Sequence, residues 1–491
     1  MERDRFIDAL RVAAVLVVVA GHWTATSVVW EPGRIAGESA LSFVPESHYA
    51  TWFLQVMPLL FFVGGFANAR SLARHDRRYL AFLKTRLRRL LEPTILFIAV
   101  WLAVGLAAEA LPLPQPNLLD RGADVAALPF WFVGVYVVVV ALAPLMHRLH
   151  ERWGRRAVAV MAAGALGIDM IVYPVGVEAI GFVNYAFVWL LPHQLGFFYA
   201  DGSLLRLRPR LLLASAAAGL GSLVVLTRVF DYPVSMIMVP GEDRWNSDPP
   251  SLALVGVSIL LISLALLARP AVLRGRAGGR WIDLLNRVPL SMYLWHVSAI
   301  SIAVAILYPL GFPQHAIGST DWWLWRPVWL LALAVSLFVL VTLTKRFEVH
   351  PSPGIVPGGN EGLAPASVFG VLLVAVALLG FGVTGFNRPL ANTGEGLLGL
   401  TMNPLSNVVH LLLGVAVLTT ISRGRHSTVS TAAAGLLLLV LGATGWAEGL
   451  GLIGGNRALA NLDLALGTTG AVAAVIAVRT ARTLPKRNEG P

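Results

Sequence analysis

The sequence predicts an all-α protein, a polytopic transmembrane helical bundle of about 14 spans with both termini in the cytoplasm. Hydrophobic residues make up 56% of the 491 residues and charged residues only 13%, whereas soluble domains carry about 25% charged residues. The mean hydropathy is +0.71. Most of the 38 Lys and Arg fall in alternate connections between apolar runs, which the positive-inside rule assigns to the cytoplasm. We therefore expect a multi-pass protein of the plasma membrane.

Charge and cysteine usage exclude several classes of function. The net charge of +11 does not indicate nucleic acid as a partner, because it is sorted between the two membrane faces rather than gathered on one surface. The chain has no cysteine, which excludes disulfides, zinc–thiolate sites and a thioester carried by the protein. We expect membrane lipids as partners, no metal and no permanently bound cofactor.

The first apolar segment, residues 6–30, contains Asp8, Arg11 and His22. Arg11 and His22 are eleven residues apart, which places them on one stripe of a helix and about 16 Å apart along its axis. Asp8 precedes Arg11 at i,i+3, close enough to pair with it. One interpretation is an anchoring Asp–Arg pair and a histidine satisfied by a neighbour. The other is a polar track leading to a base in the middle of the membrane.

The second predicted span, residues 52–70, contains Pro58 and the pair Gly64-Gly65, which permits close approach of another helix or a ligand. A basic segment, residues 70–92, follows and ends just before Pro93. Its arginines suit a polyphosphate ligand, because guanidinium binds phosphate bidentately. The alternative is topogenic charge attracted to anionic lipid headgroups.

The later spans carry further polar groups. His193 lies in the sixth span, where a packed, hydrogen-bonded histidine is the simpler interpretation, and Tyr293 and His296 lie near the start of the ninth. The predicted spans from the third to the tenth are 93–111, 130–147, 157–173, 180–200, 211–230, 251–268, 288–310 and 327–344.

Composition also predicts the domain organisation. Residues 1–347 form a ten-span membrane domain, and a Pro/Gly linker covers 348–365. A four-span membrane domain covers 366–480, with spans near 366–384, 404–421, 429–446 and 464–478. Residues 481–491 form a basic cytoplasmic tail.

Five motifs in the first 350 residues resemble the integral-membrane acyltransferase-3 family of O-acyltransferases. They are FIDALRVAAVLVVVAGH, QVMPLLFFVGGF, RLRRLLEP, PHQLGFFYADG and PLSMYLWH, and the fourth is similar to actinobacterial members. Many members have Ser-Gly-Phe where this chain has Gly64-Gly65-Phe66, so no serine hydroxyl is available there. Residues 366–480 resemble an actinobacterial four-helix membrane domain of unknown function, mainly through NPLSNVVH.

The resemblance implies transfer of an acyl group, expected to be acetyl, from cytoplasmic acyl-CoA as co-substrate to a hydroxyl of a cell-surface glycan, glycolipid or secondary metabolite. It implies His22 as the general base, with Arg86, Arg89 and Arg11 binding acyl-CoA. Asp8, His296, Tyr293 and His193 would support them.

Two other classes of function fit parts of the sequence. A 14-span proton-coupled exporter would use intramembrane Asp, Arg and His as a proton relay, but the chain divides into ten and four spans rather than similar halves. A purely structural or assembly role does not explain why Arg11 and His22 lie on one stripe of the first helix.

Overall fold

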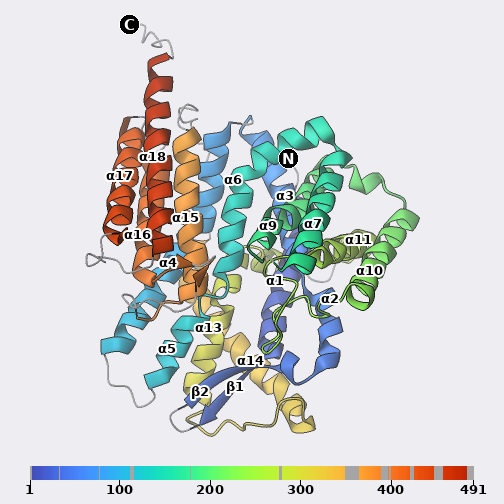
Figure 1. Ribbon diagram of the computed structural model, residues 1–491. Coiled ribbons are helices and arrows are strands. Elements are labelled where there is room, and N and C mark those ends of the chain that lie inside the picture. The colour runs from blue at the N-terminus through green and yellow to red at the C-terminus, as the bar shows by residue number, and fades with distance from the viewer. Residues whose placement is uncertain are drawn as a thin grey trace. The chain divides into compact units, whose positions relative to one another are not determined.

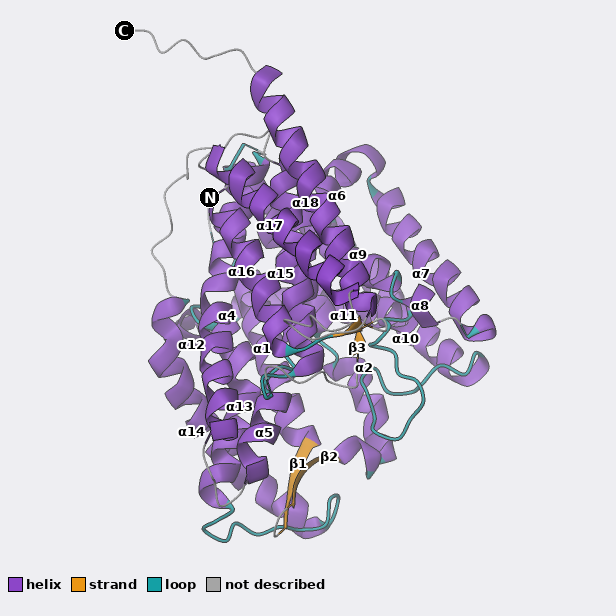
Figure 2. Ribbon diagram, turned by 60° about the vertical axis from the view of Figure 1, so that its left-hand side comes forward, coloured by secondary structure: helices purple, strands orange, loops and turns teal. Residues whose placement is uncertain are grey.

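The computed structural model is built from helices, apart from two short antiparallel strand pairs (Figures 1 and 2). It describes residues 3–31, 34–76, 78–110, 116–176, 178–275, 279–348, 364–388, 396–397, 400–420, 425–446 and 457–483. The predicted linker and basic tail lie mostly outside the described residues. The chain divides into two compact units, one of Met1–Ser71 with Ala143–His350 and one of Leu72–Leu142 with Pro351–Pro491.

The first unit contains the first predicted span and the later spans of the ten-span domain. Its elements are α1 (Arg5–Ala25), β1 (Thr26–Glu31), β2 (Arg34–Ser39), η1 (Ala40–Ser42), η2 (Pro45–Ala50), α2 (Thr51–Leu54), most of α3 (Met57–Arg74), the end of α6 (Phe130–Trp153), α7 (Arg155–Val175), α8 (Glu178–Gly181), α9 (Asn184–Ala200), η3 (Leu204–Arg206), α10 (Pro209–Val229), α11 (Leu252–Arg274), α12 (Gly279–Leu285), α13 (Pro289–Leu307), α14 (Thr320–Thr344) and η4 (Lys345–Phe347).

The second unit combines α4, α5 and the start of α6 with the C-terminal helices. Besides the end of α3 and the start of α6, its elements are α4 (Tyr79–Ala110), α5 (Pro116–Val125), α15 (Ala364–Thr384), β3 (Gly396–Leu397), β4 (Leu400–Thr401), α16 (Pro404–Thr420), α17 (Arg425–Trp446) and α18 (Arg457–Thr483). A cluster of stacked and tilted rings, made by Phe97, Phe130, Phe381 and Phe386, joins α4 and α6 to α15 and the residues just after it.

The polytopic helical bundle predicted from composition is confirmed. Among the described residues, twelve helices are long and apolar enough to cross a membrane, against about 14 predicted. The two remaining predicted positions hold shorter helices, α9 and α16, of 17 residues each. A helix of that length spans about 26 Å, slightly less than the ~30 Å hydrocarbon core.

Three predicted boundaries are wrong in informative ways. The first span ends at Ala25 rather than residue 30, because Thr26–Glu31 pairs with Arg34–Ser39 as a hairpin. Its β-branched residues favour a strand. The second span is interrupted at Gln55 and Val56, and α3 begins at Met57 with Pro58 in its first turn, where the missing amide of a proline costs no helical hydrogen bond. The third begins at Tyr79, so the basic segment is largely the first part of a 32-residue helix.

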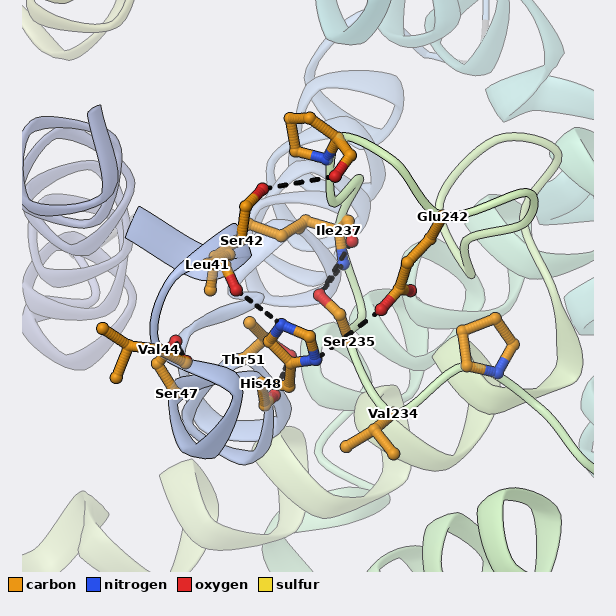
Figure 3. A network of polar contacts seen from close by, with 12 residues as sticks. Leu41, Ser42, Val44, Ser47, His48, Thr51, Val234, Ser235, Ile237 and Glu242 are labelled. Atoms are coloured by element: carbon orange, nitrogen blue, oxygen red, sulfur yellow. Dashed lines mark hydrogen bonds and ion pairs between the residues drawn. The ribbon is translucent and has the colours of Figure 1, made fainter. Parts of the chain in front are cut away.

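The loop between α10 and α11 is fastened to the segment that follows the hairpin (Figure 3). The Met236 amide donates to the Thr51 hydroxyl over 2.9 Å. The Ser42 hydroxyl donates to the Pro240 carbonyl, and His48 lies 4.0 Å from a Glu242 carboxylate oxygen. These contacts give the loop between α10 and α11 a defined shape, although the loop itself has no helix or strand.

A glycine contact brings α3 and α9 close together. A Cβ added at Gly65 would lie 1.9 Å from the His193 carbonyl oxygen, and one at Gly196 would lie 2.3 Å from the Phe62 carbonyl oxygen. Both obstacles are backbone atoms, so neither helix can give way by moving a side chain alone. Tight helix packing, one of the two roles considered for Gly64-Gly65, therefore describes Gly65.

Replacing Gly65 with alanine should destabilise the protein by about 1–3 kcal/mol, the usual cost of overpacking a core. Thermal unfolding in detergent micelles would measure it. Gly167→Ala on α7 is the matched control, because a Cβ there meets nothing within 4 Å; that variant should be neutral or slightly stabilised. A Gly65→Ala protein as stable as the wild type would contradict the close packing.

Candidate active site

The site is organised by two histidines from helices that pack against each other, α1 and α13. His22 Nδ1 lies 2.7 Å from His296 Nε2, and the two rings stack with centroids 4.9 Å apart. The Trp23 indole donates a hydrogen bond to the His296 carbonyl over 2.8 Å, which fixes the two helices in register. His296 is fully buried, whereas His22 keeps an exposed surface.

The hydrogen bonds determine which ring nitrogen of each neutral histidine carries the proton. His296 Nδ1 lies 2.5 Å from the Tyr293 carbonyl oxygen, which can only accept, so His296 carries its proton on Nδ1. His296 Nε2 is then an acceptor, and His22 must donate to it from Nδ1. The lone pair of His22 therefore resides on Nε2. That atom bonds to none of the described residues, so the exposed side of His22 presents a base.

A polar cluster surrounds the start of α1. Arg11 donates to the Asn286 side-chain oxygen over 2.9 Å, and Asn286 donates in turn to Asp8 over 2.7 Å. Arg11 and Asp8 lie 3.9 Å apart as the predicted i,i+3 pair, and Arg3 also pairs with Asp8. Asp8 is thus a shared acceptor that holds the helix start against the turn before α13.

Glu348 joins this cluster from the first residue of the predicted linker, just after the ten-span domain. Its two carboxylate oxygens accept from the amides of Leu290 and Ser291 over 2.8 and 2.7 Å, at the first turn of α13. Burial raises the pKa of Glu348, opposed by these amide bonds and by the nearby charge of Arg11. The carboxylate occupies the positive end of the helix dipole, and so fixes the start of the helix that carries His296.

Arg86 and Arg89 lie in the second unit, on the basic part of α4. Arg86 donates to the Tyr136 hydroxyl over 3.0 Å. Arg89 is exposed and has Arg86 and Arg74 as charged neighbours. None of the carboxylates in the described part of the chain pairs with these three residues, whereas Arg88 pairs with Glu92 at i,i+4. We call Arg74, Arg86 and Arg89 the arginine cluster; three cations without an acid suit an anionic ligand.

His193 belongs to a different part of the first unit. It is fully buried, and its Nε2 lies 3.0 Å from the Asn68 amide nitrogen. The structure therefore places His193 in the α3–α9 packing contact and not beside the His22–His296 pair. Tyr293, by contrast, contributes its carbonyl directly to that pair, with its own ring 5.8 Å from the His296 ring.

Comparison with known protein families decides the class. Residues 4–345 match the family described as "Acyltransferase domain" (Acyl_transf_3). The chain belongs to the acyltransferase-3 family. It is a membrane acyltransferase, and a separate domain of unknown function (DUF4383) covers residues 364–479. Neither the curated proteins nor the solved structures contain a match.

Three residues that matter to this acyltransferase site were missed by sequence reasoning. Asn286 and Glu348 lie in connections with ordinary polar composition, and Trp23 reads as one more apolar residue of its helix. Each acts through a partner more than 50 residues away in the chain. The nearest available signal was the helix start at Pro289, because Pro at a first helical position indicates a terminus with unpaired amides.

Proposed function

We propose that this acyltransferase transfers an acyl group, acetyl being the simplest, from acyl-CoA to a hydroxyl of a cell-surface glycan, glycolipid or secondary metabolite. The donor would arrive from the cytoplasm, where both termini lie, and the chain would reside in the plasma membrane. The observation that carries the proposal is the His22–His296 pair, because it holds one unprotonated ring nitrogen toward an open side.

The pair supports general-base catalysis. As the acceptor oxygen attacks the thioester carbonyl, its proton moves to His22 Nε2. His22 becomes an imidazolium, still donating from Nδ1 to His296, which shares its positive charge through the hydrogen bond. The tetrahedral intermediate then expels the coenzyme A thiolate by breaking the C–S bond, and the proton on Nε2 passes to that sulfur. Because the chain lacks cysteine, direct transfer needs no acyl–cysteine intermediate.

His296 is a positioning residue in this mechanism. Its Nδ1–H is fixed by the Tyr293 carbonyl, and its Nε2 fixes the tautomer of His22. The arrangement parallels the general use of a third group to orient a catalytic base. Arg11, held by Asn286 and Asp8, keeps the helix start in place and would contribute a positive charge to donor binding.

The arginine cluster is the proposed site for the phosphates of coenzyme A. Substituting both Arg86 and Arg89 with glutamine should raise the KM for acetyl-CoA about tenfold or more and leave kcat within a few-fold, because charge-assisted bonds to phosphate contribute about 1.5–3 kcal/mol each. The assay follows coenzyme A release and transfer of labelled acetyl to a lipid and glycan extract, with reconstituted full-length protein.

Two comparisons make this test specific. Arg88→Gln is the matched control, since Arg88 is adjacent but already paired with Glu92, and its KM should not change. S-acetylpantetheine lacks the nucleotide phosphates, so the wild type should use it poorly and the double variant should discriminate little between the two donors. Equal preference for acetyl-CoA in the double variant and the wild type would contradict the phosphate role. No transfer from any acyl-CoA would contradict the proposed function.

A further inference from the structure

The first unit contains a cavity of about 380 Å³ that the mechanism above does not use. It lies between β1, the loop that follows α13 and the helix α14, and its lining includes six aromatic side chains. These are Trp30, Tyr308, Phe312, Trp322, Trp325 and Trp329. We call this space the aromatic cavity. The Gln314 side-chain amide accepts from the Trp30 backbone N–H and donates to the Trp30 carbonyl, which ties β1 to the loop after α13 and closes one wall.

The wall of the aromatic cavity includes a buried cation, Arg326. Its side chain is 7% exposed, and its guanidinium carbon lies 3.7 Å from the centre of the Trp322 ring. Arg326 Nη2 donates to the Ser27 hydroxyl over 2.6 Å and to the Thr26 carbonyl over 3.2 Å. Arg326 Nε and Nη1 donate to no group in the described part of the chain, and no carboxylate in that part of the chain pairs with the guanidinium.

Such a cation is costly to bury without a counter-charge. The ring beneath it offsets part of that cost, but the remaining donors point to an anion that comes from outside the chain. Two further polar atoms of the cavity lining, Trp329 Nε1 and His315 Nε2, are buried without a hydrogen-bond partner among the described residues. Within the described part of the chain, the cavity therefore offers flat apolar faces together with two unpartnered donors, Arg326 Nε and Trp329 Nε1, and one unpartnered histidine nitrogen.

The aromatic cavity is close to the proposed base along the chain. His22 lies three residues before the end of α1, and Ser27 lines the cavity two residues beyond that end. Helical and extended rises per residue place Ser27 about 11 Å beyond His22 along the chain. A ligand held in the cavity can thus approach the base from the end of α1.

We propose that the aromatic cavity is the acceptor subsite, and that it selects a hydroxyl-bearing ring that carries a carboxylate or a phosphate. The ring faces pack on the tryptophans, and the anionic group pairs with Arg326, which can bind either anion bidentately. This inference rests on the proposed function, because it names the class of acceptor for that reaction.

Binding to the reconstituted full-length protein, without acyl-CoA, tests the subsite. The probes are methyl glucuronide, glucose 6-phosphate, the neutral methyl glucoside, and glycerol 3-phosphate as an anion without a ring, all followed by tryptophan fluorescence and saturation-transfer NMR. We expect methyl glucuronide or glucose 6-phosphate, or both, to bind tenfold or more tightly than methyl glucoside and glycerol 3-phosphate. Whichever charged ring binds distinguishes a carboxylate from a phosphate acceptor.

Variants separate recognition from structural support. Arg326→Gln should abolish the preference for a charged ring, and Arg326→Lys should keep part of it. Trp325→Leu, at a side chain that is 40% exposed, should weaken every ring probe without unfolding the protein. Arg244→Gln is the matched control, because Arg244 also lies over an aromatic ring, that of Tyr173. If Arg326→Gln lowers only thermal stability and leaves the preference intact, the subsite assignment is wrong.

The subsite and the proposed reaction can fail separately. Arg326-dependent binding of a charged ring, with no acyl transfer from any donor, would retain the subsite and overturn the reaction. Acyl transfer to an extracted acceptor whose KM is the same in the wild type and in Arg326→Gln would retain the reaction and overturn the subsite.

Discussion

Replacing His22 with glutamine should lower kcat for acyl transfer by about 10²–10⁴-fold, the usual contribution of a general base. Glutamine can still donate to His296 Nε2 through its amide group, so the helix contact is largely preserved, but it has no nitrogen that accepts the proton of the acceptor hydroxyl. The KM for acetyl-CoA should remain within a few-fold of the wild type. Steady-state kinetics on reconstituted protein would measure both constants.

The pH profile adds a second readout for the same residue. The rate of the wild type should fall tenfold per pH unit on the acid side, because protonated His22 cannot act as a base. The small residual rate of His22→Gln should lack this dependence. His48→Gln, in the polar network of the η2 segment, is the control and should keep both the rate and the profile.

The positioning role of His296 predicts a different pattern. His296→Phe removes the acceptor for His22 Nδ1–H, so His22 loses its fixed tautomer and orientation. The rate should fall less than in His22→Gln, and the acid limb of the pH profile should move, because the base itself remains. A His22→Gln protein with nearly full activity would show that another group takes the proton.

Membrane class and helix positions could be predicted from the sequence because both depend on local composition. Long apolar runs must satisfy their backbone groups within the bilayer, and only a helix does this segment by segment. The same logic failed at Thr26–Glu31, where the apolar run continues but the chain forms a hairpin with Arg34–Ser39. Hydropathy does not distinguish a strand from the last turns of a helix when both are apolar.

The candidate site was predictable only in part. His22 and Arg11 could be singled out because an ionisable residue inside a membrane span is costly, and helical geometry put them on one stripe. The pairing of His22 with His296 joins residues 274 positions apart, and no local pattern encodes such a contact. Arg326 was hidden for a similar reason: its significance comes from Ser27 and Trp322 around it, which only the packing of α14 against β1 reveals.

The C-terminal helices contain a buried ionic contact, and breaking it should strongly destabilise them. His410 on α16 and Asp463 on α18 are both almost fully buried, with His410 Nε2 2.9 Å from Asp463 Oδ1. His410 Nδ1 lies 2.7 Å from the Ser406 carbonyl oxygen, which can only accept. Both nitrogens of His410 therefore face acceptors, which favours an imidazolium paired with a carboxylate.

Asp463→Ala should lower the free energy of unfolding by about 3 kcal/mol. Breaking a buried ion pair costs about 3–5 kcal/mol, and leaving one buried polar atom unpaired costs about 1–3 kcal/mol, so the expected value lies where the two ranges meet. The imidazole can lose its charge, which keeps the cost at the junction of the two ranges. Asp463→Asn should cost far less, because the amide donates to the freed lone pair of a neutral His410 while Nδ1 still donates to Ser406. Unfolding by SDS titration in mixed micelles would measure both variants, with exposed Thr468→Ala on α18 as the control. Equal stability of the alanine and asparagine variants would mean that the pair contributes through packing rather than through its charges and hydrogen bond.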